Sequence, residues 1–188
     1  MNPKHILILK GSPRPKGNSS LLADQVAAGA KESGATVEVF TLQDMDIAPC
    51  NACDACQVNA DQVCTIDDDM QQIYPGLRKA DAIVLAGPVY WFTLCAQLKL
   101  CIDRWYAFET PKGSLLRGKQ FALLLAYGDT DPYTSGGINA IRTFEDMCRY
   151  LKAPVAGILY ATAMNPGDVK KQPDLLERAF NLGKKLAG

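Results

Sequence analysis

Five short apolar runs alternate with segments of helical spacing, and this alternation constrains the fold more than any other feature of the chain. Each apolar run has the length of a strand. The expected strands are residues 5–10, 36–42, 81–86, 121–126 and 155–162. The expected helices are a first one from near residue 19, then residues 67–79, 94–105, 137–151 and 173–186. The pattern predicts an α/β fold with a doubly wound, five-stranded parallel sheet in three α/β/α layers.

Length and charge narrow the possible classes of protein. At 188 residues the chain is predicted to be one domain, residues 1–188, with a cysteine-rich insertion at residues 47–66. The 20 basic residues balance 20 acidic ones, so no charge excess points to nucleic acid or to a membrane surface. No apolar stretch reaches about 18 residues, and the first apolar run is too short for a signal peptide. We therefore expect a cytoplasmic protein that contacts no membrane.

The first strand ends in a polar loop with the chemistry of a phosphate site. In such a strand–loop–helix junction, the N–H groups at the helix start lack partners and the helix dipole favours an anion. An ordinary turn with a helix cap needs only two or three polar residues, so the length of this run favours phosphate binding over capping alone. The candidate binding residues are Ser12, Arg14, Gly17, Asn18, Ser19 and Ser20.

The missing motifs limit which phosphate compound is expected. No G-x-x-x-x-G-K-S/T motif occurs, so a P-loop nucleotidase is not expected. No G-x-G-x-x-G follows the first strand, which argues against a dinucleotide site. A loop rich in hydroxyl groups suits the terminal phosphate of a mononucleotide. In flavodoxin-like sheets, the mononucleotide held at the switch point of the strand order is FMN.

Two further loops are expected at the same edge of the sheet. The third strand is predicted to end at Gly87-Pro88, and the loop after it places aromatic side chains where a flavin ring would lie. Aromatic residues at a strand end also occur in cores and interfaces, but their place after a central strand favours flavin contact. A glycine- and serine-rich loop follows the fourth strand. The candidate residues from these two loops are Pro88, Val89, Tyr90, Trp91, Phe92, Tyr127, Gly128 and Asp129.

Four cysteines are clustered between the second strand and the next helix. Cys50, Cys53, Cys56 and Cys64 form the pattern Cys-x2-Cys-x2-Cys-x7-Cys. Four thiolates can hold an iron–sulfur cluster or a zinc ion, and they can also serve thiol redox chemistry or remain inert in a tight loop. No histidine lies nearby, which argues against a mixed zinc site. Cys95, Cys101 and Cys148 lie on helical patterns and are expected in the core.

The segments GSPRPKGNSS, PCNACDAC with Cys64 and the following DDDM, and GPVYWFTLCAQLKLCIDR together resemble the NADPH-dependent FMN reductase family. Within that family the chain looks most like the iron–sulfur flavoproteins, which carry a compact four-cysteine motif at this place. The resemblance spans residues 5–151 and includes Lys99, Asp103 and Arg104. It implies a flavodoxin-like fold, bound FMN, and a homodimer or homotetramer in which each flavin lies near a subunit interface.

The resemblance implies an enzyme in which FMN takes electrons from NADH or NADPH and passes them to a quinone, a flavin or another small-molecule acceptor. One alternative is an iron–sulfur flavoprotein with a 4Fe–4S cluster that accepts electrons from ferredoxin. Another is a flavin-binding protein without catalysis. His5, the only histidine, starts a buried strand, and no Ser-His-Asp or Cys-His pair is evident. We therefore name no catalytic acid or base.

Aromatic residues also predict an oligomer. Six of them cluster at the end of the third strand and in the helix that follows, and a domain of this size has limited room to bury them all. Exposed aromatic patches usually mark interfaces. The six residues are Tyr90, Trp91, Phe92, Trp105, Tyr106 and Phe108.

Overall fold

The computed structural model describes residues 2–58 and 64–188 and contains the expected doubly wound sheet. Five parallel strands lie in the order β2-β1-β3-β5-β6, and a short sixth strand, β4, pairs antiparallel with β3. The strands are β1 (His5–Lys10), β2 (Thr36–Thr41), β3 (Ala82–Tyr90), β4 (Thr93–Leu94), β5 (Gln120–Tyr127) and β6 (Val155–Thr162). The order reverses between β1 and β3, and a ligand is expected outside the carboxyl ends of these strands.

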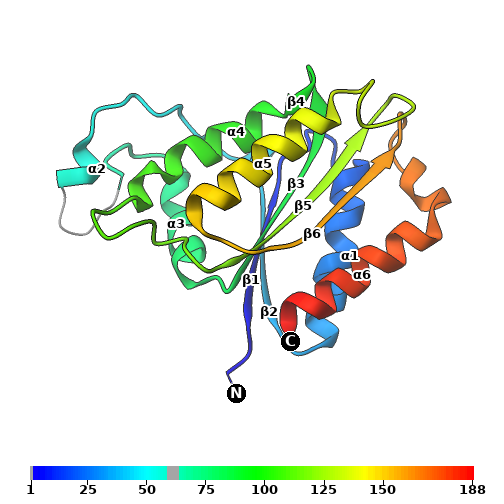
Figure 1. The fold of residues 1–188 in the computed structure, drawn as a ribbon, viewed down its shortest axis with the longest axis horizontal. Coiled ribbons are helices and arrows are strands. Elements are labelled where there is room, and N and C mark those ends of the chain that lie inside the picture. Colours follow the sequence, from blue (N-terminus) through cyan, green and yellow to red (C-terminus); the bar gives the residue numbers. More distant parts are fainter. Residues whose placement is uncertain (1, 59–63) are drawn as a thin grey trace.

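Helices cover both faces of the sheet (Figure 1). Helices α1 and α6 lie on one face, and α3, α4 and α5 lie on the other. The α-helices are α1 (Asn18–Glu32), α2 (Ala55–Val58), α3 (Met70–Lys79), α4 (Ala96–Asp103), α5 (Gly137–Leu151) and α6 (Pro173–Ala187). Three 3₁₀ turns are η1 (Leu42–Asp44), η2 (Arg104–Phe108) and η3 (Asp168–Lys171). Within the described ranges, no helix has the length and apolar character needed to cross a membrane.

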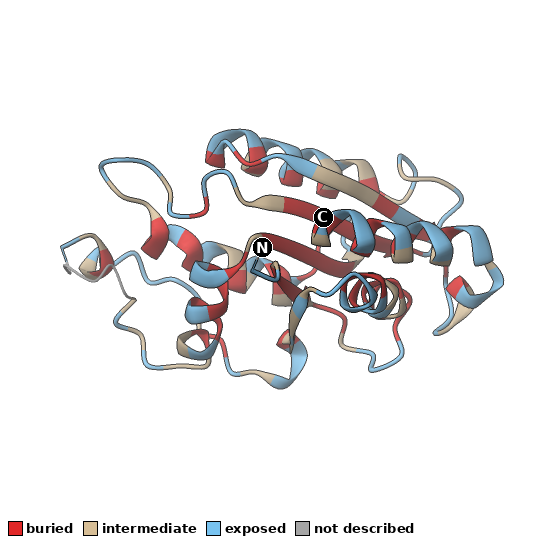
Figure 2. Cartoon of the chain, turned by 90° about the horizontal axis from the view of Figure 1, so that it is seen from below, coloured by how far each residue is buried: buried red, intermediate tan, exposed pale blue. Residues whose placement is uncertain are grey.

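The central strands are buried on both faces, as Figure 2 shows, because each face is covered by helices. Alternate residues of β1 enter the two halves of the core. Leu7 and Leu9 pack beneath α3 and α4, while Ile6 and Ile8 pack beneath α1 and α6. Burying each such side chain contributes about 1.5–3 kcal/mol. This rigid sheet holds the ends of β1, β3 and β5 at fixed positions next to one another.

Strand β3 is longer than the sequence indicates. It continues through Gly87 and Pro88 to Tyr90, so the expectation that Gly87-Pro88 ends the strand is wrong. The last β1 residue, Lys10, pairs with Ala86. Beyond Ala86 the strand has only β5 as a parallel neighbour, and proline is tolerated on such an edge.

Two of the six clustered aromatic residues belong to the core. Trp105 and Phe108 are buried because η2 turns them inward, where Trp105 packs against Phe121 and Phe108 meets Tyr74 edge-on at 5.5 Å. The chain therefore buries two of the six residues, in line with the expectation that it has limited room to bury them all. Exposed surface remains on Tyr90, Trp91, Phe92 and Tyr106. The expected core positions of Cys95, Cys101 and Cys148 are confirmed.

Helices α1 and α6 cross in close contact through two glycines. A Cβ atom on Gly183 would lie 2.0 Å from the carbonyl oxygen of Val26, and one on Gly29 would lie 2.0 Å from that of Phe180. Both obstacles are backbone atoms, so the helices must move apart to admit a methyl group. Gly183→Ala should therefore lower the free energy of unfolding by about 1–3 kcal/mol in urea titrations. Asn181→Ala, on the exposed face of α6, is the control and should change stability by less than about 0.5 kcal/mol.

Candidate functional site

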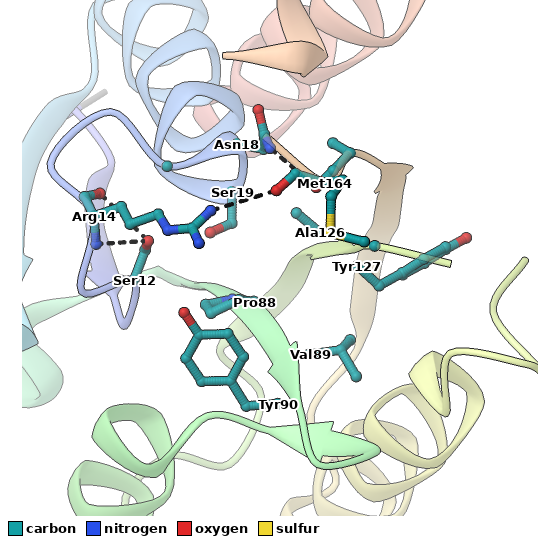
Figure 3. A pocket seen from close by; sticks show the side chains of 13 residues that line it. Ser12, Arg14, Asn18, Ser19, Pro88, Val89, Tyr90, Ala126, Tyr127 and Met164 are labelled. Atoms are coloured by element: carbon teal, nitrogen blue, oxygen red, sulfur yellow. Dashed lines mark hydrogen bonds between the residues drawn. The ribbon is translucent and has the colours of Figure 1, made fainter. Parts of the chain in front are cut away.

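A cavity of about 210 Å³ lies at the carboxyl ends of the strands, where all three expected loops meet. The loop after β1 forms one wall, and the end of β3 faces it across the cavity (Figure 3). Most of the candidate residues line it: Ser12, Arg14, Gly17, Asn18, Ser19, Pro88, Val89, Tyr90, Tyr127 and Gly128. Thus one hollow joins a polar loop to the end of an apolar strand, as a ligand with a charged tail and an aromatic body requires.

The loop before α1 depends on a glycine and a serine. The hydroxyl of Ser12 accepts a hydrogen bond from the N–H of Arg14 at 3.2 Å, which tightens the turn. A Cβ atom on Gly17 would lie only 2.3 Å from the Ser12 Oγ atom. Gly17 therefore has to be a glycine for the loop to close on Ser12, and this closure brings the loop against the start of α1.

The start of α1 has the properties of an anion site. Within a helix the N–H groups of the first turn have no acceptor, and no acidic residue occupies this turn. The Ser19 hydroxyl is buried and has no hydrogen-bond partner among the described residues. A buried hydroxyl without a partner costs free energy, which a phosphate oxygen in the cavity would offset.

The side chain of Asn18 has a different role from the one the sequence suggests. Its amide nitrogen donates to the carbonyl oxygens of Ala163, at 3.2 Å, and Asn165, at 2.9 Å. Its oxygen accepts from the N–H of Val169 at 3.1 Å. The side chain therefore ties the loop after β6 to α1, and only the backbone N–H of Asn18 is left at the helix start for an anion.

The remaining candidates lie beside the main cavity. Trp91, Phe92 and Asp129 line an adjoining cavity of about 460 Å³. The two cavities share four lining residues: Val89, Tyr127, Gly128 and Met164. Ser20 lies in a smaller hollow of about 140 Å³ that also includes Lys10 and Thr41. Sequence reasoning missed Ala126 at the end of β5, and Ala163 and Met164 just after β6. The rule that ligands bind at the carboxyl ends of strands applies to β6 as well and could have indicated the last two.

Two aromatic residues in left-handed backbone conformations form the turn between β3 and β4. Trp91 has φ 45° and Phe92 has φ 64°, and they alone join the paired residues Tyr90 and Thr93. Such turns normally carry Asn-Gly. The carbonyl oxygen of Phe92 accepts from the side-chain amide of Asn139 on α5, at 3.2 Å. The strained turn thus presents Trp91, which is 93% exposed, at the rim of the second cavity.

Trp91→Asn should raise the stability of the isolated chain by about 1 kcal/mol, because asparagine tolerates positive φ and tryptophan does not. Little packing is lost at this exposed position. Urea unfolding at low protein concentration measures the change. Trp91→Ala removes the same ring but keeps the strained φ, so it should give no gain. An equal gain from alanine would show that the ring, not the backbone, causes the strain.

Comparison with known proteins agrees with this architecture. The family model described as having a flavodoxin-like fold matches residues 4–186. The chain belongs to this flavodoxin-like family. An iron–sulfur flavoprotein of Methanocaldococcus jannaschii is 32% identical, over 97% of this chain and 95% of the relative. An FMN-dependent NADH:quinone oxidoreductase of Bordetella parapertussis is 34% identical, over 66% of this chain and 68% of the relative. A solved NAD(P)H:quinone oxidoreductase from Methanothermobacter marburgensis has the same fold, with a TM-score of 0.76, 23% identity, and coverage of 100% of this chain and 98% of that one.

The described residues of the cysteine segment, 47–58 and 64–66, lie against α3 and η2, at the other end of α4 from the β4 hairpin (Figure 1). Cys50 and Cys53 are exposed, Cys56 is buried and Cys64 is partly buried. Residues 59–63, within the last gap of the motif, lie outside the described residues. In the described part, no three histidine, cysteine or acidic side chains come together as a metal site. The donor chemistry suits iron, but the described geometry is not that of a formed cluster site.

A buried arginine holds both ends of this segment. Arg104 donates to the carbonyl oxygen of Ala48 at 2.9 Å, to the Cys64 Sγ atom at 3.3 Å, and to both carboxylate oxygens of Asp68. Burial alone would raise the pKa of Cys64, but the Ile66 N–H and the guanidinium of Arg104 outweigh it and lower that pKa. The same guanidinium and two backbone N–H groups outweigh burial at Asp68 and lower its pKa.

Proposed function

We propose that this chain binds FMN in the cavity at the ends of β1, β3 and β5, within a single domain, and works as an NAD(P)H-dependent oxidoreductase. The observation that carries the proposal is the continuity of the hollow from the anion site at the start of α1 to the apolar end of β3. The orphan hydroxyl of Ser19 and the glycine-dependent closure of the loop fit a phosphate group. The flavin oxidoreductases among the relatives support the same role.

The loop before α1 would hold the phosphate. Ser19 would donate its hydroxyl, the first turn of α1 its N–H groups, and Arg14 a charge-assisted hydrogen bond. The segment of Pro88, Val89 and Tyr90 would support the flavin ring, with Trp91, Phe92, Tyr127, Gly128 and Asp129 around the adjoining cavity. When bound, FMN would supply the redox chemistry that carries electrons from a nicotinamide to an acceptor. The residues that line the two cavities would orient this group.

Flavin binding and turnover test the proposal. Purified protein should bind FMN with quenching of flavin fluorescence, and the complex should oxidise NADH or NADPH when a quinone is supplied. Comparing the two nicotinamides and a series of quinones, flavins and azo compounds would identify the acceptor class. If the protein binds FMN but oxidises neither NADH nor NADPH, the proposed oxidoreductase activity is wrong. Absence of FMN binding would contradict the whole assignment.

The second candidate function is electron transfer from ferredoxin through an iron–sulfur cluster at Cys50, Cys53, Cys56 and Cys64. The observation that favours it is the iron–sulfur flavoprotein at 32% identity over nearly the whole chain, together with the spacing of the four cysteines. No step of the proposed reaction passes through iron, because the described thiols are not gathered around one centre.

Anaerobic reconstitution with iron and sulfide tests this candidate. A cluster requires about four irons per chain with acid-labile sulfide, and replacing any one of the four cysteines with serine should abolish them while FMN stays bound. Rapid reduction by ferredoxin, without oxidation of NADH or NADPH, would then favour the electron carrier. Failure to incorporate iron under these conditions would leave the FMN oxidoreductase alone.

We also propose that the chain forms a homodimer or homotetramer that covers the β3–β4 hairpin. Tyr90, Trp91 and Phe92 are each at least 42% exposed, and large apolar side chains grouped on a surface usually mark an interface. Light scattering at micromolar concentration with FMN bound tests the assembly. A monomeric mass would rule it out.

A further inference from the structure

Met164, in the loop after β6, lines both cavities. The residue is 65% exposed, and its thioether points toward the end of β5 in Figure 3. A Cβ atom on Gly128 would lie 2.9 Å from both the sulfur and the terminal methyl of Met164. The thioether therefore rests on the bare backbone of Gly128, at the point where the two cavities join.

The loop that carries Met164 is held by Arg14 and Asn18, at the start of α1 and in the loop before it. The three hydrogen bonds of the Asn18 side chain reach Ala163 and Asn165, on either side of Met164, and Val169 beyond them. Arg14 adds a longer contact of 3.4 Å to the carbonyl oxygen of Met164. Asn18 is buried at the start of α1, so the position of the Met164 loop depends on the same residues that shape the anion site.

We propose that Met164 is a flavin-binding residue whose thioether covers the ring where the two cavities join, and that Asn18 is the residue that positions it. This inference rests on the proposed binding of FMN. A ligand that reaches from the start of α1 to the second cavity has to pass the thioether. Methionine is suited to this contact, because its flexible side chain and polarisable sulfur pack favourably against aromatic rings.

Oxidation of methionine in the dark by hydrogen peroxide, followed by mass spectrometry, tests the contact in the unmodified protein. FMN at saturation should slow oxidation of Met164 by about fivefold, because oxidation follows exposure of the sulfur. Met45 and Met147, which line neither cavity, serve as internal controls and should oxidise at the same rate with and without FMN.

Variants test the contribution of each residue. Met164→Ala should weaken FMN binding by about twofold to tenfold, as expected for loss of a sulfur–aromatic contact, and Met164→Leu should restore part of it. Riboflavin, which lacks the phosphate, separates two roles for Asn18. If Asn18 positions Met164, Asn18→Ala weakens the binding of riboflavin as well as that of FMN. In a protein that already carries Met164→Ala, adding Asn18→Ala then causes no further loss of riboflavin affinity. If the Asn18 side chain binds phosphate, only FMN binding falls.

The outcomes distinguish this inference from the proposed function. FMN binding that leaves the oxidation rate of Met164 unchanged would overturn the role of Met164 and leave the oxidoreductase assignment standing. A loss of affinity in Asn18→Ala that is confined to FMN would overturn the positioning role. Failure of the protein to bind any flavin would overturn both proposals.

Discussion

Arg104→Met should lower the free energy of unfolding by about 3–5 kcal/mol, the usual cost of removing one partner of a buried ion pair. The guanidinium side chain is fully buried, and the carboxylate side chain of Asp68 is only 6% exposed. Methionine fills much of the same volume, so the loss comes chiefly from the charge left on Asp68 and from the hydrogen bonds to Ala48 and Cys64. The change is among the largest expected for a residue outside the cavity. Urea unfolding at neutral pH measures it.

A matched control is available one turn earlier on α4. Lys99→Met removes a cation from an exposed pair with Asp103 and should cost less than about 0.5 kcal/mol. Adding Asp68→Asn to Arg104→Met removes the stranded charge and should recover part of the stability. If the double variant loses as much free energy of unfolding as the two single variants together, Asp68 and Arg104 do not act as a pair.

The titration of Asp68 should make the effect of Arg104→Met on stability depend on pH. In the wild type the pKa of Asp68 is lowered from its ordinary value of 3.8, so its stabilising contribution is present above that pH and is lost as the pH falls below it. Without Arg104 the backbone N–H donors of Ala48 and Met70 remain, but burial is the largest single influence on this carboxyl, and we expect it to raise the pKa of Asp68 in the variant. Between pH 7 and pH 4 acidification then neutralises the stranded carboxylate and stabilises the variant, while the contribution of Asp68 to the wild type is still present. The difference in unfolding free energy between the two should therefore shrink from pH 7 towards pH 4.

Local patterns were sufficient to predict most of the fold. The apolar runs that became β1, β3 and β5 are buried on both sides, and their lack of alternation is typical of central parallel strands. Segments 137–151 and 155–162 were located to the residue as α5 and β6. The loop before α1 was recognisable because its glycine, serines and arginine lie within nine residues of one another. All these signals come from neighbouring residues.

The features that escaped prediction depend on contacts between distant residues or on backbone strain. The local sequence predicts that the Asn18 side chain binds phosphate, because the groups with which it forms hydrogen bonds lie about 150 positions later in the chain. The carboxylate that pairs with Arg104 lies 36 residues earlier in the chain, just after the cysteine segment. Gly87-Pro88 indicated the end of β3, and the true turn at Trp91 and Phe92 carries none of the residues that favour positive φ. In each case tertiary contacts override the local preference, as is common near functional sites.

Arg14→Ala should weaken FMN binding by about tenfold to a hundredfold, because a hydrogen bond to a charged group contributes about 1.5–3 kcal/mol. Arg14 is exposed at the mouth of the cavity, and Figure 3 shows its guanidinium reaching over the space between Ser19 and Met164. Ser19→Ala should also weaken binding, by less, since it removes a neutral donor. Fluorescence titration with FMN measures both affinities.

Two comparisons show whether the lost affinity belongs to the phosphate. Lys16→Ala removes an exposed cation from the same loop at a position that lines neither cavity, and should leave FMN affinity within about twofold of the wild type. Riboflavin affinity should change little in Arg14→Ala, because the phosphate is absent from that ligand. The single contact of Arg14 with the Met164 loop, at 3.4 Å, is too long to carry a large effect on the ring. If Arg14→Ala and Ser19→Ala both bind FMN normally, the phosphate lies elsewhere; if riboflavin and FMN weaken equally, Arg14 acts through the Met164 loop instead.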